Sequence, residues 1–209
     1  MNPSVFDRLR LANVTKGEPR RNAASANCPE TSDESDARVA TLLEQYALKE
    51  VTVRGDGNCQ FRALSRALNG DEDGHERVRA RVMEHLNARA ETFKRFVGEG
   101  EDEDRQWGRY VEGMSKSGTW GDHLTLQAFT ETYNRVVWLL TDYESRPVLK
   151  FTPSESSETS GGSSSTQSVV VLTFRAELHY NATEETTLGI NDAEDDDEEE
   201  DKDGNDDEN

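Results

Sequence analysis

Residues 55–64 read Gly-Asp-Gly-Asn-Cys-Gln-Phe-Arg-Ala-Leu, and this stretch indicates a loop that passes directly into a helix. Glycine tolerates positive φ angles, and Asp and Asn side chains hydrogen-bond nearby backbone groups, so the first four residues are typical of a tight turn. Apolar residues then recur at helical spacing, at Phe61, Leu64 and Leu68. Cys59 is therefore expected at the N-terminus of a helix.

This position of Cys59 suits a nucleophile. The unpaired N–H groups and the positive end of the helix dipole favour a thiolate over a thiol. A flexible turn also lets backbone N–H groups converge beside the sulfur, as an oxyanion site requires. The alternative is a small apolar cysteine on a buried helix face, which is common for free cysteines. The stretch alone leaves both interpretations open.

A cysteine nucleophile needs a base, usually histidine, and a group that orients it. His75 and His85 lie in a charged segment and are expected to be solvated, while His123 lies in an expected helix and is open to either environment. His179 is the preferred candidate, because strand alternation places it on the same face as Asn181, whose amide can hold the imidazole in one tautomer. A strand-end histidine that merely packs is the alternative.

Three segments together resemble the ovarian tumour (OTU) family of cysteine proteases, in particular its small plant-like and protist branch. They are residues 55–64, residues 115–128 (Ser-Lys-Ser-Gly-Thr-Trp-Gly-Asp-His-Leu-Thr-Leu-Gln-Ala) and residues 176–181 (Ala-Glu-Leu-His-Tyr-Asn). The segments occur in the family's order, and the resemblance covers about residues 37–183. It implies a papain-like fold and a deubiquitinase.

The resemblance also implies roles for individual residues. Cys59 matches the nucleophile, His179 the general base, and Asn181 the residue that orients the base. Some relatives carry Asp at this last position, so Asn181→Asp is expected to be tolerated. Asp56 matches the aspartate that shapes the oxyanion loop. Two residues match the family's Trp-Gly block and are expected to be architectural: Trp120 and His123.

The order of the expected elements predicts an α+β fold, with a small central β-sheet packed between helices. Helices are expected first, and strands dominate later in the chain. The expected helices are one capped by Asp36, one from Cys59, and those at about 74–97, 107–114 and 124–133. The expected strands are 50–53, 135–141, 148–151 and 168–174.

Charge divides the chain of 209 residues, whose net charge is −19. Residues 192–209 hold thirteen Asp or Glu and one Lys, so this segment carries −12 and the rest carries −7. Because such a run repels itself and buries nothing, we expect residues 186–209 to be a disordered acidic tail. Residues 1–34 are expected to be a polar, partly disordered N-terminal extension. Residues 35–185 then form the OTU-like cysteine protease domain, with a flexible Ser/Gly-rich insertion at 153–168.

Other classes of function are disfavoured. Cys28 and Cys59 do not make a disulfide framework, which fits a reducing compartment such as the cytoplasm or nucleus. No Cys-x-x-Cys or paired histidines indicate a metal site, and no cofactor is expected. The longest apolar run, residues 136–140, is too short for a membrane span. The net negative charge disfavours nucleic-acid binding. A monomer is expected.

The leading interpretation is a deubiquitinase, which hydrolyses (iso)peptide bonds at the C-terminal glycine of ubiquitin with Cys59 as nucleophile and His179 as base. Ubiquitin or polyubiquitin chains are then the partner. The alternative is a catalytically weak or inactive OTU-fold module that binds ubiquitin as a scaffold, with its acidic tail binding basic partners. No motif indicates which ubiquitin linkage is cut.

Overall fold

The computed structural model describes residues 15–16, 32–98, 102–154, 168–176 and 178–186. The helices are α2 (Ser32–Tyr46), α3 (Cys59–Asn69), α4 (His75–Ala88), α5 (Ala90–Phe93), the 3-10 helix η1 (Lys94–Phe96), α6 (Glu103–Met114) and α7 (His123–Tyr133). The strands are β1 (Thr15–Lys16), β2 (Leu48–Val51), β3 (Val136–Thr141), β4 (Val148–Phe151), β5 (Val169–Arg175) and β6 (His179–Glu185).

The six strands form one mixed sheet in the order β1-β4-β3-β5-β6-β2. Strand β3 is buried along its whole length, as expected of an apolar strand that is covered on both faces. It runs antiparallel to β4 and parallel to β5. Strand β6 lies antiparallel between β5 and β2, and it pairs His179 with Arg175 and Asn181 with Thr173. These pairs place four polar residues on one face of the sheet at its end.

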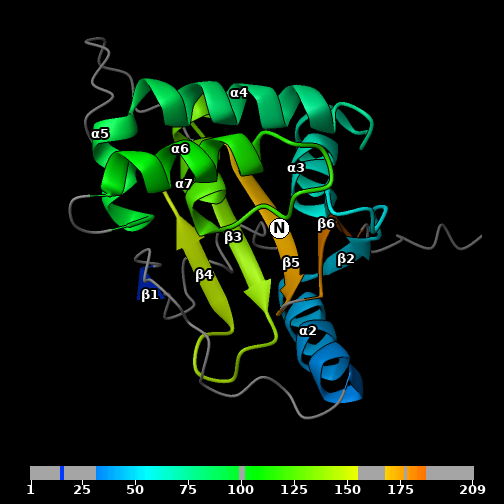
Figure 1. Cartoon of the computed structure of the whole chain (residues 1–209). Helices are drawn as coiled ribbons and strands as arrows, with labels where there is room; N and C mark the ends of the chain where they lie inside the picture. Colours follow the sequence, from blue (N-terminus) through cyan, green and yellow to red (C-terminus); the bar gives the residue numbers. More distant parts are fainter. Residues whose placement is uncertain (1–14, 17–31, 99–101, 155–167, 177, 187–209) are drawn as a thin grey trace, which may run out of the picture.

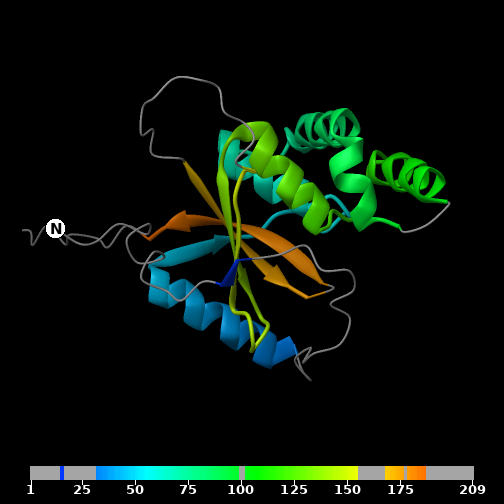
Figure 2. The same ribbon diagram turned by 90° about the vertical axis from the view of Figure 1, so that its left-hand side faces the viewer.

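Helices cover both faces of the sheet. Figure 2 shows α2 on one side, while the helices from α3 to α7 gather on the other. Each face buries its own apolar cluster, and the smaller one, under α2, includes Leu42, Tyr46 and Trp138. The larger cluster lies beneath α3, α4 and α7 (Figure 1). The prediction of an α+β fold with a central sheet between helices is confirmed.

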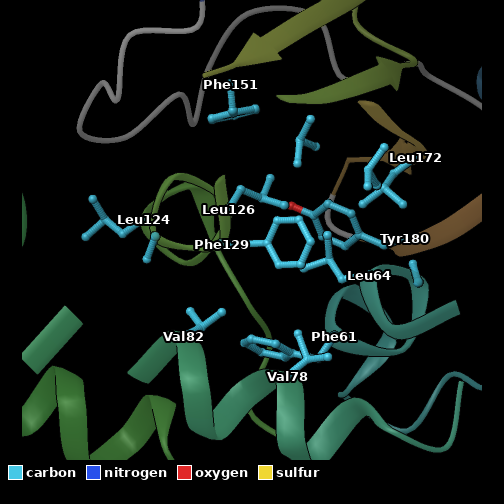
Figure 3. Close-up of a cluster of buried hydrophobic side chains, with 14 of the residues drawn as sticks. Phe61, Leu64, Val78, Val82, Leu124, Leu126, Phe129, Phe151, Leu172 and Tyr180 are labelled. Atoms are coloured by element: carbon cyan, nitrogen blue, oxygen red, sulfur yellow. The ribbon is translucent and has the colours of Figure 1, made fainter. Parts of the chain in front are cut away.

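The larger cluster fixes the start of α3 against β6. Phe61 and Leu64 of α3 and Phe129 of α7 are fully buried. Figure 3 shows Leu64 and Phe129 beside Tyr180 of β6, with Phe61 next to Val78 of α4. Full burial of each such side chain contributes roughly 1.5–3 kcal/mol. Since Tyr180 follows His179 directly, this packing brings the N-terminus of α3 to the strand end that carries His179.

Several element boundaries differ from the expected ones. Helix α2 begins at Ser32 rather than at Asp36. Its first turn contains Asp33 and Glu34, whose negative charges are stabilising at the positive end of the helix dipole. Asp36 instead accepts a hydrogen bond from Arg175 at 2.5 Å. The expected helix at 74–97 divides at Arg89 into α4, α5 and η1. The N-terminal extension adds an unexpected two-residue strand, β1, parallel to β4.

The expectation that His75 and His85 are solvated is wrong. His75 is buried, with Nδ1 3.2 Å from the carbonyl oxygen of Glu72. His85 lies with Nε2 2.8 Å from Glu131 Oε2, and that carboxylate is almost fully covered. The reason is that α4 packs between α3 and α7, so polar positions near its apolar stripe are also covered.

Some predictions fall outside the described residues, namely Cys28, the acidic tail from residue 187, and residues 155–167 of the Ser/Gly-rich insertion. Within the described ranges, no helix is both long and apolar enough to cross a membrane. The same ranges contain no group of three or more side chains suited to hold a metal ion.

Candidate active site

Cys59 is the first residue of α3, as the loop motif predicts. Asn58 is the residue before the helix, and Gly57 has a φ of 81°, which only glycine adopts at little cost. The Cys59 side chain is 6% exposed and lies at the edge of the larger apolar cluster. The first backbone N–H groups of α3 therefore lie beside the sulfur without partners inside the helix.

Asp56 shapes the loop through two kinds of hydrogen bond. Its Oδ1 accepts the backbone N–H of Asn58 at 3.0 Å, which closes the turn. The Arg62 guanidinium donates from Nη2 to Oδ2 at 2.6 Å and from Nε to both oxygens at 3.1 Å. These bonds connect the loop to helix α3, which contains Arg62. They also hold the pKa of Asp56 far below the ordinary range.

A second loop, residues 115–122, lies against residues 54–58, the loop before Cys59, which we call the cysteine loop. The Asn58 side chain accepts the backbone N–H of Gly118 through Oδ1 at 2.8 Å. A Cβ atom on Gly57 would lie only 2.1 Å from the carbonyl oxygen of Gly118. The two backbones are thus in direct contact, and glycine is required at position 57 for space as well as for φ.

Arg79 of α4 forms hydrogen bonds to both loops and to the end of α6. Its guanidinium donates to Asn58 Oδ1 at 2.8 Å, to the Met114 carbonyl at 2.8 Å and to the Thr119 carbonyl at 2.7 Å. The guanidinium also lies 4.0 Å from the centre of the Phe61 ring. Burial lowers the pKa of Arg79 to about 10, so it remains a cation at neutral pH. A buried cation therefore lies directly beneath the cysteine loop.

Gln60, the residue after Cys59, anchors the second loop from the other side. Its Nε2 donates to the Asp122 carbonyl at 3.1 Å, and its Oε1 accepts the Thr125 hydroxyl at 2.6 Å. A Cβ on Gly121 would overlap the Gln60 side chain. The loop that carries the Trp-Gly block is therefore packed on the residue next to Cys59.

The expected architectural roles of Trp120 and His123 have different outcomes. His123 is partly buried and stacks on Phe151, with ring centres 5.8 Å apart, as an architectural residue does. Trp120 is 55% exposed, so its ring does not pack into the fold. The loop backbone around it is held by its neighbours, which leaves the indole free to face solvent.

His179 lies over the start of the cysteine loop. Its Nε2 is 3.0 Å from the carbonyl oxygen of Val53. Since a carbonyl only accepts, Nε2 must carry the proton, and the lone pair of a neutral imidazole is then on Nδ1. A Cβ atom on Gly55 would lie 3.8 Å from Nδ1 and 3.6 Å from Cε1. The basic nitrogen is thus on the side of the ring that faces the loop leading to Cys59.

Asn181 contacts Val53 rather than the imidazole. Its Oδ1 accepts the backbone N–H of Val53 at 3.1 Å, and its side chain is buried. The residue therefore holds the backbone to which His179 is bonded. Sequence alternation correctly places Asn181 and His179 on one face, but the expected direct contact is replaced by one through Val53.

Tyr180 links the strand of His179 to the helix of Cys59. Its ring is buried beside Leu64 of α3 (Figure 3), and burial raises the pKa of its phenol well above the ordinary value. Helix α3 packs on β6 in the same region. The four predicted site residues, Cys59, His179, Asp56 and Asn181, therefore gather at one end of the sheet.

Three further residues support this site and were not predicted from the sequence: Arg62, Arg79 and Glu50. Only Arg79 had a usable signal, because it precedes Val82 and Met83 by one helical turn and so shares their buried face. Arg62 and Glu50 are recognisable only from their contacts. Glu50 accepts two hydrogen bonds from Arg175, at 2.7 and 3.1 Å, across 125 positions of the chain.

The profile of the OTU-like cysteine proteases matches residues 54–181, from the start of the cysteine loop to Asn181. The chain belongs to the OTU-like cysteine protease family. It is 36% identical over 167 residues to the ovarian tumor domain-containing deubiquitinating enzyme 10 of Arabidopsis thaliana, and 32% identical over 177 residues to enzyme 12 of the same plant. The resemblance to the plant branch of the OTU family is thereby confirmed.

These matches cover 77% and 83% of this chain. They cover 43% of enzyme 10 and 73% of enzyme 12, so the chain spans less than half the length of the first of these relatives. Among solved structures, the OTU domain of OTUD1 superposes with a TM-score of 0.58 at 19% identity, over 72% of this chain and 95% of that domain. This likeness shows that the fold is that of an OTU domain.

Proposed function

We propose that this OTU domain is a cysteine-type deubiquitinase that cleaves (iso)peptide bonds at the C-terminal glycine of ubiquitin. The observation that carries the proposal is the hydrogen bond from His179 Nε2 to Val53. It assigns the proton to Nε2 and leaves Nδ1 as the base toward the loop of Cys59. The relatives named as deubiquitinating enzymes supply the substrate class.

In the first half of the reaction, Nδ1 of His179 accepts the thiol proton and the Cys59 sulfur attacks the glycine carbonyl. A C–S bond forms, and the carbonyl electron pair moves onto oxygen, where N–H groups of the Asp56–Cys59 loop stabilise it. When the intermediate collapses, the C–N bond breaks and the imidazolium gives its proton to the leaving amine. The product is a thioester between Cys59 and the glycine.

In the second half, His179 takes a proton from water, and the resulting hydroxide attacks the thioester carbonyl. The C–S bond breaks, ubiquitin leaves with a free carboxylate, and the sulfur regains its proton from the imidazolium. Asp56 and Arg62 keep the loop in shape throughout. Preorganised donors of this kind cost no rearrangement during the reaction.

Exposed apolar side chains next to the site favour a protein as the substrate. Within the described part of the chain, the large apolar side chains that are strongly exposed are Trp120 and Leu178, at 55% and 58%. Trp120 belongs to the loop packed on Gln60, and Leu178 precedes His179. Apolar side chains at an interface centre supply much of its binding energy. We infer that both contact the bound ubiquitin tail or body.

Hydrolysis of a fluorogenic ubiquitin, with the dye on its C-terminal glycine, tests the proposal. The wild-type domain and Cys28→Ala should release the dye at equal rates, while Cys59→Ala should release none and still bind ubiquitin. A wild-type domain that binds ubiquitin without hydrolysis would instead support the inactive scaffold. No contact among the described residues favours that alternative.

A further inference from the structure

A carboxylate on strand β2 lies behind the candidate base. Glu50 accepts hydrogen bonds from both terminal nitrogens of Arg175, at 2.7 and 3.1 Å, and from the hydroxyl of Thr173. Arg175 is also bonded to Asp36 of α2. Burial alone raises the pKa of Glu50, but hydrogen bonds from Arg175, Thr173 and Asn181 outweigh it, and the pKa lies below the ordinary value. Glu50 is therefore an anion.

Glu50 lies beside Asn181 and determines which way its amide points, because Asn181 pairs across the sheet with Thr173, whose hydroxyl donates to Glu50. An ionised carboxylate only accepts, so the end of the Asn181 amide that faces Glu50 is its NH2 group. Its oxygen is then directed at the N–H of Val53, where it lies at 3.1 Å. The two ends of this buried amide thus have partners of opposite kind, and a flipped amide would lose both.

Val53 connects Asn181 to His179 through two hydrogen bonds. Its N–H is bonded to Asn181, and its carbonyl on the other side of the same Cα accepts Nε2 of His179. The residue also leads directly into the loop 54–58. A chain of contacts therefore runs from Glu50 through Asn181 and Val53 to the imidazole.

We propose that Glu50 is a positioning residue that orients Asn181, and through Val53 the imidazole of His179, and that it is the reason position 181 requires an amide. The proposal rests on the proposed function for its effect on rate. It reverses the expectation that Asn181→Asp is tolerated. An aspartate at 181 still accepts the N–H of Val53, but its second oxygen faces the carboxylate of Glu50, and two like charges at hydrogen-bond distance repel.

An exchange of the two side-chain types tests this pairing. In Glu50→Gln combined with Asn181→Asp, the glutamine amide nitrogen donates to the aspartate, and its oxygen still accepts from Arg175. The double variant therefore keeps one carboxylate and one amide in this pair, and it loses only one of the two hydrogen bonds from Arg175. Asn181→Asp alone has two facing carboxylates, while Glu50→Gln alone has two amides and a weakened partner for Arg175.

The experiment compares wild type, both single variants and the double variant. Asn181→Asp should lower kcat about tenfold or more with little change in KM, because orientation of the base is lost and ubiquitin binding is not. The double variant should return to within about threefold of the wild-type kcat. Glu184→Gln, on the exposed end of β6, is the control and should equal wild type.

Two measurements without turnover separate this proposal from the proposed function. The ring ¹⁵N signals of His179 should report the Nε2–H tautomer in wild type, a mixture in Asn181→Asp, and the Nε2–H form again in the double variant. The melting temperature should fall in Asn181→Asp and recover in the double variant. The proposal is overturned if the double variant resembles Asn181→Asp in tautomer and stability, or if Asn181→Asp resembles wild type.

Discussion

The Arg62 guanidinium holds the Asp56 carboxylate from within α3, with Nη2 of Arg62 2.6 Å from Oδ2 of Asp56. The arginine is nearly fully covered, whereas the aspartate side chain is 40% exposed. The loop before Cys59 is therefore tied to the helix that follows it. The same carboxylate closes the turn through the N–H of Asn58, so the turn-forming and loop-positioning interpretations of Asp56 are both realised in one group.

We predict that Asp56→Asn folds and binds ubiquitin normally but cleaves it more slowly. An amide still accepts the N–H of Asn58, but it is a weaker partner for Arg62 than a carboxylate. If the loop's oxyanion donors lose their alignment, the expected loss is on the order of 10²–10³ in single-turnover rate. Arg62→Gln should have a similar effect, and the double variant should be little worse, since the two act as a unit. A wild-type rate in Asp56→Asn would show that the turn alone matters.

A comparison of Gly57 with Gly70 tests the contact between the two loops, with Gly70 as the control. Their φ angles are 81° and 80°, but a Cβ meets the Gly118 carbonyl at position 57 and open space at position 70. Gly70→Ala should cost about 1–2 kcal/mol from backbone strain. Gly57→Ala should cost clearly more in denaturant unfolding and should also remove activity. Equal losses in the two variants would contradict the contact.

Arg79→Met should destabilise the domain by roughly 2–5 kcal/mol in urea unfolding, because it removes the guanidinium that donates to two backbone carbonyls and one of the two donors of the Asn58 oxygen. The control is Arg81→Met, two positions further along α4, whose guanidinium lies 5.9 Å from the Tyr133 ring on the exposed side. Its effect should stay within about 1 kcal/mol. Comparable effects at the two positions would rule out a special role for the buried cation.

His123 makes stability depend on pH. Burial lowers its pKa below the ordinary 6.5, so the unfolded chain takes up a proton at a pH where the folded one does not. The stability that neutral His123 provides is thus complete above about pH 6.5 and is lost as the pH falls, by up to about 1.4 kcal/mol per pH unit. In His123→Phe, which keeps the stacking on Phe151, unfolding free energy should decline less between pH 7 and 5. Parallel curves for the two proteins would contradict this.

Regular patterns in the sequence predicted the elements that carry the site. Helical spacing after Cys59, the apolar run of β3 and the alternation around His179 depend on local periodicity, which the fold preserves. The supporting residues depend on pairing between distant positions, such as Glu50 with Arg175 or Asn58 with Arg79, and no local pattern carries that information. For the same reason His85 was expected in solvent, although Glu131 lies beside it.

The orientation of Asn181 shows the same limit at the site itself. Alternation identifies the face that Asn181 shares with His179, but it does not show that the Val53 backbone lies between them. Val53 approaches because β2 pairs with β6 only as far as Val51, after which the chain turns toward Cys59. Sequence reasoning therefore finds the residues of the site more readily than their contacts.

The most direct test of the account uses ubiquitin with a thiol-reactive group in place of its C-terminal carboxylate, followed by mass spectrometry of the adduct. The full chain should gain one ubiquitin, attached to Cys59 and not to Cys28. Cys59→Ala should gain none, and His179→Ala should react far more slowly because the thiol has lost its base. Labelling at Cys28, or undiminished labelling of Cys59→Ala, would contradict the assignment of Cys59 as the nucleophile.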